Sequence, residues 1–422
     1  MTKFFVIAAF FGDGSFEVMK FLHAADLHLD TPFQGLDALP EMWQHRLTAA
    51  PFTALQRLVD LAITEQVDFV LLVGDLFDQQ AQSVPAQAAL MAALDQLAAE
   101  QIPVILSFGN HDFQPDVTTW HFPANVHVFD AQVTTVELTT KQQQRVAITG
   151  FSYDQRWVTT PKVQDFPLKR TGVDYQIGML HGQVGTSGDH YAPFAVSDLL
   201  AKHYDYWALG HIHQRQTLNA MPPVMYPGNL QGRYRDELGA KGALLVTSQG
   251  DQLVPEFKPL APLVWTNWTP ELSGQLDRPT VLTQLSAQLQ SRTVTVPELV
   301  VITLPATLTL TPTAELALTQ GALLAQLQQQ APATSWPVTL QLAASDTTSD
   351  LFGMDTAIWQ QAGETTVTTE KIAALADHLL DEPFLNQTLL EATTPEQWQQ
   401  QVLRLLQDHY HLTLQGGDSD AN

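Results

Sequence analysis

Residues 67–78 read Val67-Asp68-Phe69-Val70-Leu71-Leu72-Val73-Gly74-Asp75-Leu76-Phe77-Asp78. A short apolar run that is rich in β-branched residues and closed by a glycine predicts a buried strand. Asp75 follows that strand directly, where a carboxylate is costly unless it is paired or coordinated. An aspartate at this place can also cap the N-terminus of a helix. The segment therefore predicts an α/β sheet with a charged group at the carboxyl end of a strand.

Similar apolar runs occur on both sides of this segment. We expect strands at 20–25, 102–108, 145–149, 175–180, 205–209, 224–226 and 243–246, with a helix over 85–100. Alternation of strands and helices predicts a layered α/β domain. Beyond about residue 260, Thr, Gln and Leu dominate. There, strands at 299–304 and 338–342 around one helix over 314–330 predict a small α+β domain, and further helices are expected within 369–411.

The composition narrows the function classes. The chain has 422 residues, a formal net charge of −24 and no cysteine, which excludes a disulfide scaffold, a thiol nucleophile and a cysteine zinc site. These features fit a cytoplasmic protein, and no apolar run is long enough for a transmembrane helix. Such an acidic chain argues against strong general attraction for nucleic acid. The exception is residues 141–258, which carry 12 basic and 10 acidic side chains.

Polar side chains with metal-binding potential follow five of the expected strands. They belong to the segments Asp26-Leu27-His28, Gly74–Asp78, Gly109-Asn110-His111-Asp112, His181 and Gly210-His211-Ile212-His213. Each segment alone has an ordinary structural explanation, such as a turn built from Asn and Asp or a histidine in the core. Residues i and i+2 of a strand face the same way, so Asp26 with His28, and His211 with His213, are each expected to reach one cation.

Together the five segments predict a metal centre. Binding sites of α/β sheets lie at the carboxyl ends of the strands, where all five segments fall. Seven oxygen and nitrogen ligands are too many for one ion and suit two ions that share a carboxylate. A ligand set without sulfur fits Mn²⁺, Fe or Zn²⁺, and the mixture of His, carboxylate and amide favours two Mn²⁺ ions.

The ordered set of motifs resembles the calcineurin-like metallophosphoesterase superfamily. Two segments are similar in sequence to the SbcD nuclease branch, and most of all to YhaO-type DNA repair exonucleases. They are residues 23–33, His-Ala-Ala-Asp-Leu-His-Leu-Asp-Thr-Pro-Phe, and residues 226–233, Tyr-Pro-Gly-Asn-Leu-Gln-Gly-Arg. The resemblance covers residues 19 to about 260. It implies a layered sandwich of two mixed β-sheets flanked by helices, followed by a smaller α+β cap and terminal helices.

The resemblance also implies a role for each site residue. One metal would be held by Asp26, His28, Asp75 and His213. The other would be held by Asp75, Asn110, His181 and His211, so that Asp75 bridges the two. His111 would be the catalytic residue that stabilises the reacting phosphate and protonates the leaving oxygen, and Asp78 and Asp112 would orient ligands. The implied reaction is hydrolysis of a phosphodiester by a hydroxide that bridges the metals.

Three functions remain open at this point. The resemblance favours a metal-dependent DNA nuclease in DNA repair, a 3′–5′ exonuclease with endonuclease ability. A phosphomonoesterase or cyclic-nucleotide phosphodiesterase on the same fold is the second. Against it, Gln79 and Asp112 stand where the superfamily's protein phosphatases typically carry Arg and Glu. The third is an inactive scaffold for an ATPase.

Partners are implied as well. Arg215, Arg233 and Arg235 are expected to meet DNA phosphates, unless they only form a solvated face. Members of the SbcD branch work with an SMC-like ATPase of the SbcC type, often as a two-to-two assembly, so a homodimer is also expected. The helices within 369–411 are candidates for docking on that ATPase.

The expected domain limits follow from these observations. Residues 1–18 are expected to be a disordered upstream extension, with translation beginning at Met19, or less favourably a secretion signal. The nuclease domain is expected over 19–262, the α+β cap over 263–350 and a helical segment over 351–415. Residues 416–422 are expected to form a disordered tail.

Overall fold

The computed structural model describes residues 18–31, 33, 36, 39–78, 82–343, 365–376, 398 and 402. The chain divides into two compact units, Met1–Leu342 and Ala343–Asn422. The expected extension over 1–17 and the tail over 416–422 lie outside the described residues. Of the helices expected within 369–411, the described part contains α8 (Thr369–Ala376). Within the described segments, no helix is both long and apolar enough to cross a membrane.

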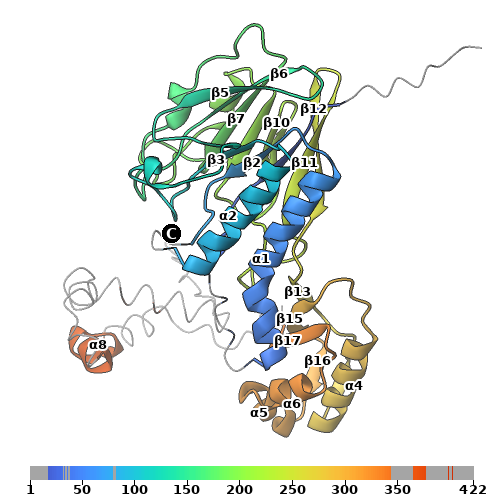
Figure 1. Ribbon diagram of the computed structural model, residues 1–422. Helices are drawn as coiled ribbons and strands as arrows, with labels where there is room; N and C mark the ends of the chain where they lie inside the picture. The colour runs from blue at the N-terminus through green and yellow to red at the C-terminus, as the bar shows by residue number, and fades with distance from the viewer. Residues whose placement is uncertain are drawn as a thin grey trace, which may run out of the picture. The chain divides into compact units, whose positions relative to one another are not determined.

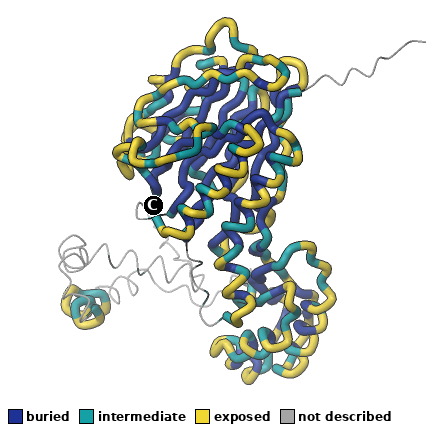
Figure 2. The backbone as a smooth tube through the Cα atoms, in the orientation of Figure 1, coloured by how far each residue is buried: buried dark blue, intermediate teal, exposed yellow. Residues whose placement is uncertain are grey.

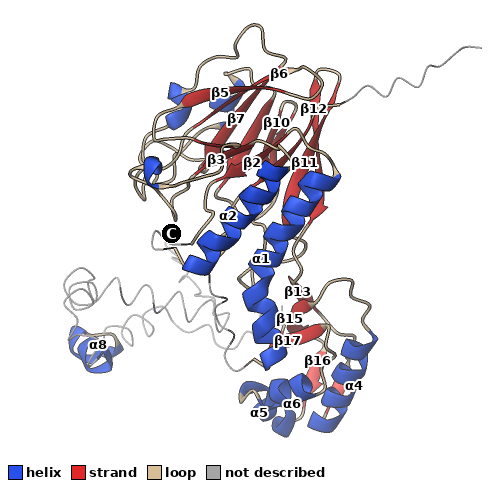
Figure 3. Ribbon diagram, in the orientation of Figure 1, coloured by secondary structure: helices blue, strands red, loops and turns tan. Residues whose placement is uncertain are grey.

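Two six-stranded mixed sheets form the main body of the first unit (Figures 1 and 3). The first sheet has the order β12-β11-β1-β2-β3-β4, in which β1 to β4 are parallel, β11 is antiparallel to β1, and β12 is antiparallel to β11. Its strands are β1 (Lys20–Ala24), β2 (Phe69–Val73), β3 (Val104–Ser107), β4 (Val126–Val128), β11 (Gly242–Gln249) and β12 (Gln252–Pro259). This sheet contains the segment from which the α/β fold was predicted.

The second sheet has the order β5-β6-β7-β8-β10-β9. Its central strands β6, β7, β8 and β10 are parallel, and β5 and β9 are antiparallel at its edges. The strands are β5 (Thr134–Thr139), β6 (Arg145–Gly150), β7 (Tyr175–His181), β8 (Tyr206–Gly210), β9 (Gln216–Ala220) and β10 (Pro223–Tyr226). Short helices α3 (Val196–Leu200), Val117–Thr119 and Lys162–Asp165 lie in the connections. Two mixed sheets flanked by helices confirm the predicted fold class.

The strands β1, β2 and β3 of the first sheet are buried on both faces (Figure 2). Phe21 and Leu71 pack between the sheets, whereas Leu22 and Leu72 pack against helices α1 (Glu41–Thr64) and α2 (Val84–Ala99). Burial on both faces explains why β2 reads as a continuous apolar run rather than an alternating one. Helix α1 is not among the elements expected from the sequence, and Pro51 lies inside it.

The remainder of the first unit contains a three-stranded parallel sheet, a two-stranded sheet and three helices. The strands are β13 (Val264–Trp268), β14 (Gly274–Leu276), β15 (Glu298–Leu304), β16 (Leu308–Leu310) and β17 (Ser335–Leu342), and the helices are α4 (Arg278–Ser291), α5 (Pro312–Thr319) and α6 (Ala322–Gln329). The single helix predicted over 314–330 is wrong. Gly321 has φ +73° and separates α5 from α6, because a left-handed residue ends a helix.

This part packs against helix α1. Trp43 and Leu47 of α1 share an apolar cluster with Trp265 and Leu299. Burial of such side chains contributes about 1.5–3 kcal/mol each. The division of the first unit between residues 262 and 263 stays a prediction from the sequence.

Candidate metal centre

The five polar segments follow strands of both sheets. Asp26 lies beyond β1, Asp75 beyond β2 and Asn110 beyond β3, while His181 ends β7 and His211 follows β8. The backbone pairing of the first sheet continues past its strands, because Asp26 N donates to the Gly74 carbonyl at 3.1 Å and His28 N donates to the Asp75 carbonyl at 3.0 Å. The site thus lies where parallel strands of the two sheets end together.

The backbone of the site is strained. Asp26, His28, Asp75 and His211 have φ values of +52°, +44°, +49° and +103°. Residues other than glycine adopt such angles at a cost of about 1–3 kcal/mol each, and they gather at functional sites. These residues lie past the strand ends, so the argument that i and i+2 side chains face the same way in a strand does not apply to them.

The ligand residues expected from the sequence form two clusters of metal-binding atoms, and a third group of His28, Asp78 and His111 shares His28 with the first of them. Asp26, His28 and His213 make one cluster, and Asp75, His181 and His211 make the other, with the ligand atoms of each within 4.8 Å of one another. The expectation from spacing alone, that His211 and His213 reach the same cation, is therefore wrong. Asn110 joins the second cluster, because its Oδ1 lies 3.1 Å from His181 Nε2 and from His211 Nδ1.

Asp75 lies between the clusters. Its Oδ2 is 3.7 Å from His28 Nε2 and 3.4 Å from His181 Nε2, and its side chain is 1% exposed. Its Oδ1 accepts a hydrogen bond from His111 N at 3.0 Å. One carboxylate thus faces nitrogen ligands of both clusters, which is the position that a bridging ligand requires.

The hydrogen bonds of the imidazoles fit a divalent metal. The Nδ1 atoms of His28 and His181 lie 3.1 Å from Asp78 Oδ1 and from the Val73 carbonyl oxygen, respectively. His213 Nδ1 lies 2.5 Å from Glu237 Oε1. Because these oxygens accept, each Nδ1 is the donor, and Nε2 is the nitrogen left to ligate a metal. The Nε2 atoms of His28 and His213 are 3.1 Å apart, a separation that suits two nitrogens at about 2.1 Å from one metal ion.

The buried carboxylates add to this fit. Burial raises the pKa of Asp26 to about 6 and that of Asp112 to about 7. Burial also opposes the charge on Asp75, yet the neighbouring His181 lowers the pKa of Asp75, and Asp75 in turn raises the pKa of His181 to about 9 against the effect of burial. A divalent cation would stabilise the charged form of these carboxylates.

The two aspartates expected to orient ligands occupy different surroundings. Asp78 accepts from His28 and lies 3.6 Å from His111 Nδ1. Asp112 is completely buried and accepts from the backbone N–H groups of Leu76 and Gly109 at 2.7 Å each. Asp112 therefore ties the turn after β2 to the turn after β3.

His111 lies beside the first cluster. Its ring is 5.1 Å from that of His28, and its side chain is 35% exposed. Its Nδ1 donates to the Asp78 carbonyl oxygen at 2.8 Å. Its Nε2 is therefore the nitrogen left to meet a substrate.

A family profile described as calcineurin-like phosphoesterase matches residues 19–215. These residues form a calcineurin-like metallophosphoesterase domain. The His and Asp clusters of this domain could hold divalent metal ions.

The metallophosphoesterase domain is similar to three curated proteins. The uncharacterised metallophosphoesterase YhaO of Bacillus subtilis is 40% identical over 252 residues, which cover 58% of this chain and 62% of that protein. The DNA double-strand break repair protein Mre11 of Archaeoglobus fulgidus is 27% identical, with 57% of this chain and 58% of that protein covered. A component of the nuclease SbcCD of Staphylococcus epidermidis is 24% identical, with 58% and 70% covered. The chain spans about three fifths of the length of YhaO and Mre11.

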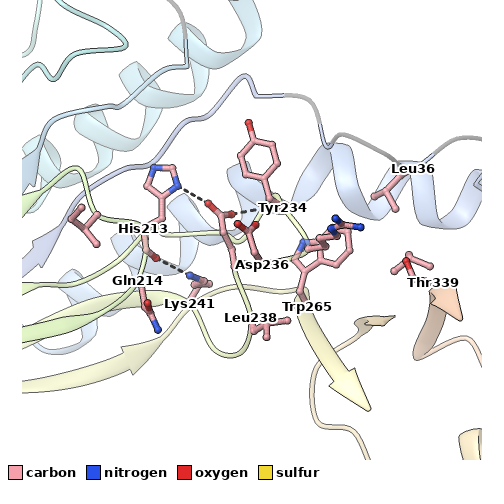
Figure 4. Close-up of a pocket in the computed structure, with 13 residues that line it drawn as sticks. Leu36, His213, Gln214, Tyr234, Asp236, Leu238, Lys241, Trp265 and Thr339 are labelled. Carbon is pink, nitrogen blue, oxygen red and sulfur yellow. Dashed lines mark hydrogen bonds and ion pairs between the residues drawn. The ribbon is translucent and has the colours of Figure 1, made fainter. Parts of the chain in front are cut away.

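Glu237 contacts His213, which is labelled in Figure 4, and is a residue of the metallophosphoesterase site that sequence reasoning missed. Besides holding His213, it accepts from Arg233 N at 2.6 Å and from Tyr234 N at 3.2 Å. Burial opposes its charge, but the hydrogen bond and positive charge of His213 lower the pKa of Glu237 to about 2. Lys241 donates to the His213 carbonyl at 2.7 Å on the other side. Glu237 lies 24 residues after His213 in the sequence. No local motif links the two residues, so no signal in the sequence points to this contact.

Arg233 does not lie where a DNA contact requires it. Its side chain is 2% exposed and donates to Thr31 Oγ1 and, at 3.2 Å, to Asp78 Oδ1. The expected contact with DNA is therefore corrected to an internal one that holds the partner of His28. Arg215 and Arg235 are exposed, and Arg215 stacks on the ring of Phe257 at 3.8 Å.

Two glycines leave room for the ligands. A Cβ on Gly109 would lie 2.2 Å from Asp75 Oδ1, and one on Gly210 would lie 2.0 Å from the Val73 carbonyl oxygen and 2.8 Å from His181 Nδ1. Gly109 is not at a positive φ, so it is required for close approach rather than for a sharp turn.

Proposed function

We propose that this protein is a two-metal DNA phosphodiesterase that acts as a 3′–5′ exonuclease, with endonuclease activity on some ends. The observation that carries the proposal is the pair of ligand clusters on either side of Asp75, whose oxygen faces both. The names of two similar proteins, a double-strand break repair protein and a nuclease component, support DNA as the substrate.

The residues that would hold the ions are those of the two clusters. Asp26, His28, Asp75 and His213 would hold one ion, and Asp75, Asn110, His181 and His211 would hold the other. We propose Mn²⁺ because the ligands mix imidazole, carboxylate and amide. Such ions supply positive charge to the phosphodiester and activate water for attack.

His111 would act on the leaving group. Its Nδ1 is held by the Asp78 carbonyl, which fixes the ring and directs Nε2 toward the substrate side. When Nε2 carries a proton, His111 can donate that proton to the oxygen that leaves phosphorus. Asp78 keeps His28 in the tautomer whose Nε2 is a ligand, and Arg233 holds Asp78 in place.

A phosphomonoesterase is the second candidate. The sequence at Gln79 and Asp112 favours the diesterase, because the phosphatases of the superfamily typically carry Arg and Glu at these positions. Turnover of phosphoprotein or phosphomonoester without any turnover of DNA would support the second candidate instead.

The deciding experiment uses one DNA duplex labelled at the 3′ end and the same duplex labelled at the 5′ end. We expect Mn²⁺-dependent release of labelled mononucleotide from the 3′ label, a ladder from the 5′ label, and no product in EDTA. The Asn110→Ala variant, which lacks a ligand of the second cluster, should lower turnover by at least roughly 100-fold. Asn219→Ala is a matched control, because the Asn219 side chain donates to the Pro222 carbonyl and to no other group among the described residues. Activity that persists in EDTA would overturn the proposal.

We also propose an SMC-like ATPase as a partner, docked through the second unit. The support is Leu375 of α8, which is 87% exposed. A pull-down with residues 1–365 and with the full chain tests this. Equal recovery of the ATPase by both would contradict docking through the second unit.

A further inference from the structure

We propose that Trp157, His190 and Tyr191 form a stacking platform for unpaired DNA bases beside the metal centre. The proposal rests on the proposed DNA phosphodiesterase function and names the surface that receives the strand end. Trp157 is 53% exposed, which is unusual for a side chain that buries a large apolar area when it packs.

The three rings connect the surface to the site. The ring of Tyr191 lies 4.5 Å from the ring of the metal-site residue His211, with 35° between their planes. His190 follows Tyr191 at 6.3 Å in an edge arrangement, and Trp157 follows His190 at 5.4 Å. A continuous row of aromatic rings therefore leads from the second cluster to an exposed indole.

The backbone holds this row in place. Val158 N donates to the His190 carbonyl at 2.9 Å, and Ala192 N donates to the Val158 carbonyl at 2.7 Å. Gln183 N donates to the Tyr191 carbonyl at 3.0 Å, which joins the segment to the end of β7. Because the main chain on both sides of the rings is paired, the platform is formed before any ligand binds.

The chemistry of the platform suits an unpaired nucleotide. Every base has a π-face, so stacking on aromatic side chains accepts any sequence. Arg156, next to Trp157, is exposed and forms no side-chain hydrogen bond or ion pair with any described residue, so its cation is free to meet a phosphate. A base that stacks on the outer face of Trp157 would place its strand a few nucleotides from the metal centre.

The test compares two substrates in Mn²⁺. For an oligonucleotide with an unpaired 3′ end, we expect Trp157→Ala to raise KM roughly tenfold and Trp157→Phe to raise it little. For bis(4-nitrophenyl) phosphate, which is too short to reach Trp157 from the metal centre, kcat/KM should be the same in both variants and the unchanged chain. Leu316→Ala is the matched control, since Leu316 is 55% exposed on α5.

A binding measurement keeps the test independent of turnover. In the Asn110→Ala background, oligonucleotide binding should quench tryptophan fluorescence, and Trp157→Phe should remove part of that quenching. An oligonucleotide with abasic sites near its 3′ end should quench less. Hydrolysis of DNA with an unchanged KM and unchanged quenching in the Trp157 variants would overturn the platform alone. Turnover of the small diester without any hydrolysis of DNA by the unchanged chain would overturn the proposed function.

Discussion

His28 and His213 face one another through their Nε2 atoms, which lie 3.1 Å apart although 185 residues separate them in sequence. The Nδ1 of each ring donates to a carboxylate, Asp78 for His28 and Glu237 for His213. Two lone pairs at this distance repel unless a cation lies beside them. The carboxylates of Asp78 and Glu237 orient the two rings and make each Nε2 more basic. We therefore expect these carboxylates to strengthen metal binding at the site.

Replacing Glu237 with glutamine should weaken that affinity. The Glu237→Gln variant loses the charge that makes His213 a better ligand, and such changes typically cost about 10–100-fold in metal affinity. Isothermal titration calorimetry with Mn²⁺ measures the change. Glu256→Gln is the control, because Glu256 is 67% exposed and, within the described part of the chain, pairs only with Lys258. Equal Mn²⁺ affinity in the two variants would contradict the role of Glu237.

Removing the Arg233 side chain should lower the stability of the fold and should lower the activity on DNA and on a small phosphodiester to the same extent. Arg233→Ala leaves Asp78 and Thr31 without their buried partner, and breaking a buried pair costs about 3–5 kcal/mol. We expect the free energy of unfolding to fall by that order in urea titrations. Activity on DNA and on a small phosphodiester should fall together. Arg235→Ala, at an exposed neighbour, should change stability by less than about 0.5 kcal/mol. A loss confined to DNA would restore the surface role for Arg233.

A methyl group at Gly109 should disturb both clusters at once. In Gly109→Ala the new Cβ would meet Asp75 Oδ1 at 2.2 Å, so Asp75 must move away from the two histidines that it faces. Overpacking of this kind costs about 1–3 kcal/mol, and Mn²⁺ binding should be lost at both positions. Gly239→Ala is the comparison, because Gly239 has φ +77° and open space around it. That variant should lose about 1 kcal/mol from backbone strain and still bind Mn²⁺. Normal Mn²⁺ binding by Gly109→Ala would refute the steric argument.

Stability should decrease in acid because of His23. Burial lowers the pKa of His23 to about 3, although its hydrogen bond with the Leu209 carbonyl opposes that shift. Between pH 6.5 and about pH 3, His23 is therefore neutral in the folded chain, whereas it takes up a proton in the unfolded chain. The resulting stability is present above pH 6.5 and is lost, at up to about 1.4 kcal/mol per pH unit, as the pH falls toward 3.

Urea titrations between about pH 7 and pH 4 in EDTA can isolate this contribution. In the His23→Gln variant, the amide can still donate to Leu209 and accept from Tyr206, but it cannot take up a proton. The variant should therefore lose stability less steeply in acid than the unchanged chain does. His45→Gln, on the exposed side of α1, is the control and should keep the full slope. Identical slopes for His23→Gln and the unchanged chain would rule out His23 as the source.

The sequence alone predicted eight strands of the two large sheets, namely β1, β2, β3, β6, β7, β8, β10 and β11, and the polar residues at their ends, but not β4, β5, β9 or β12. Short β-branched runs closed by glycine predict β2 and β3 well, because burial of both faces demands apolar residues throughout. Helix α1 was not predicted, since Pro51 lies inside it and a proline is usually a sign that a helix ends. The α5–α6 region was predicted as one helix because its apolar spacing continues through Gly321, whose φ of +73° breaks the helix.

The spacing of the residues did not decide how the site residues are shared between clusters; the family resemblance implied a division, and the tertiary structure separates the side chains. Neighbours in sequence, His211 and His213, point to different clusters because the chain leaves β8 with a φ of +103° at His211. Glu237 meets His213, and Arg233 turns inward to Asp78, through contacts across 24 and 155 residues. Local sequence patterns report strand periodicity and turn chemistry over a few residues. They carry no information on which distant carboxylate a buried imidazole or guanidinium meets, because that depends on how the two sheets and their connecting turns pack.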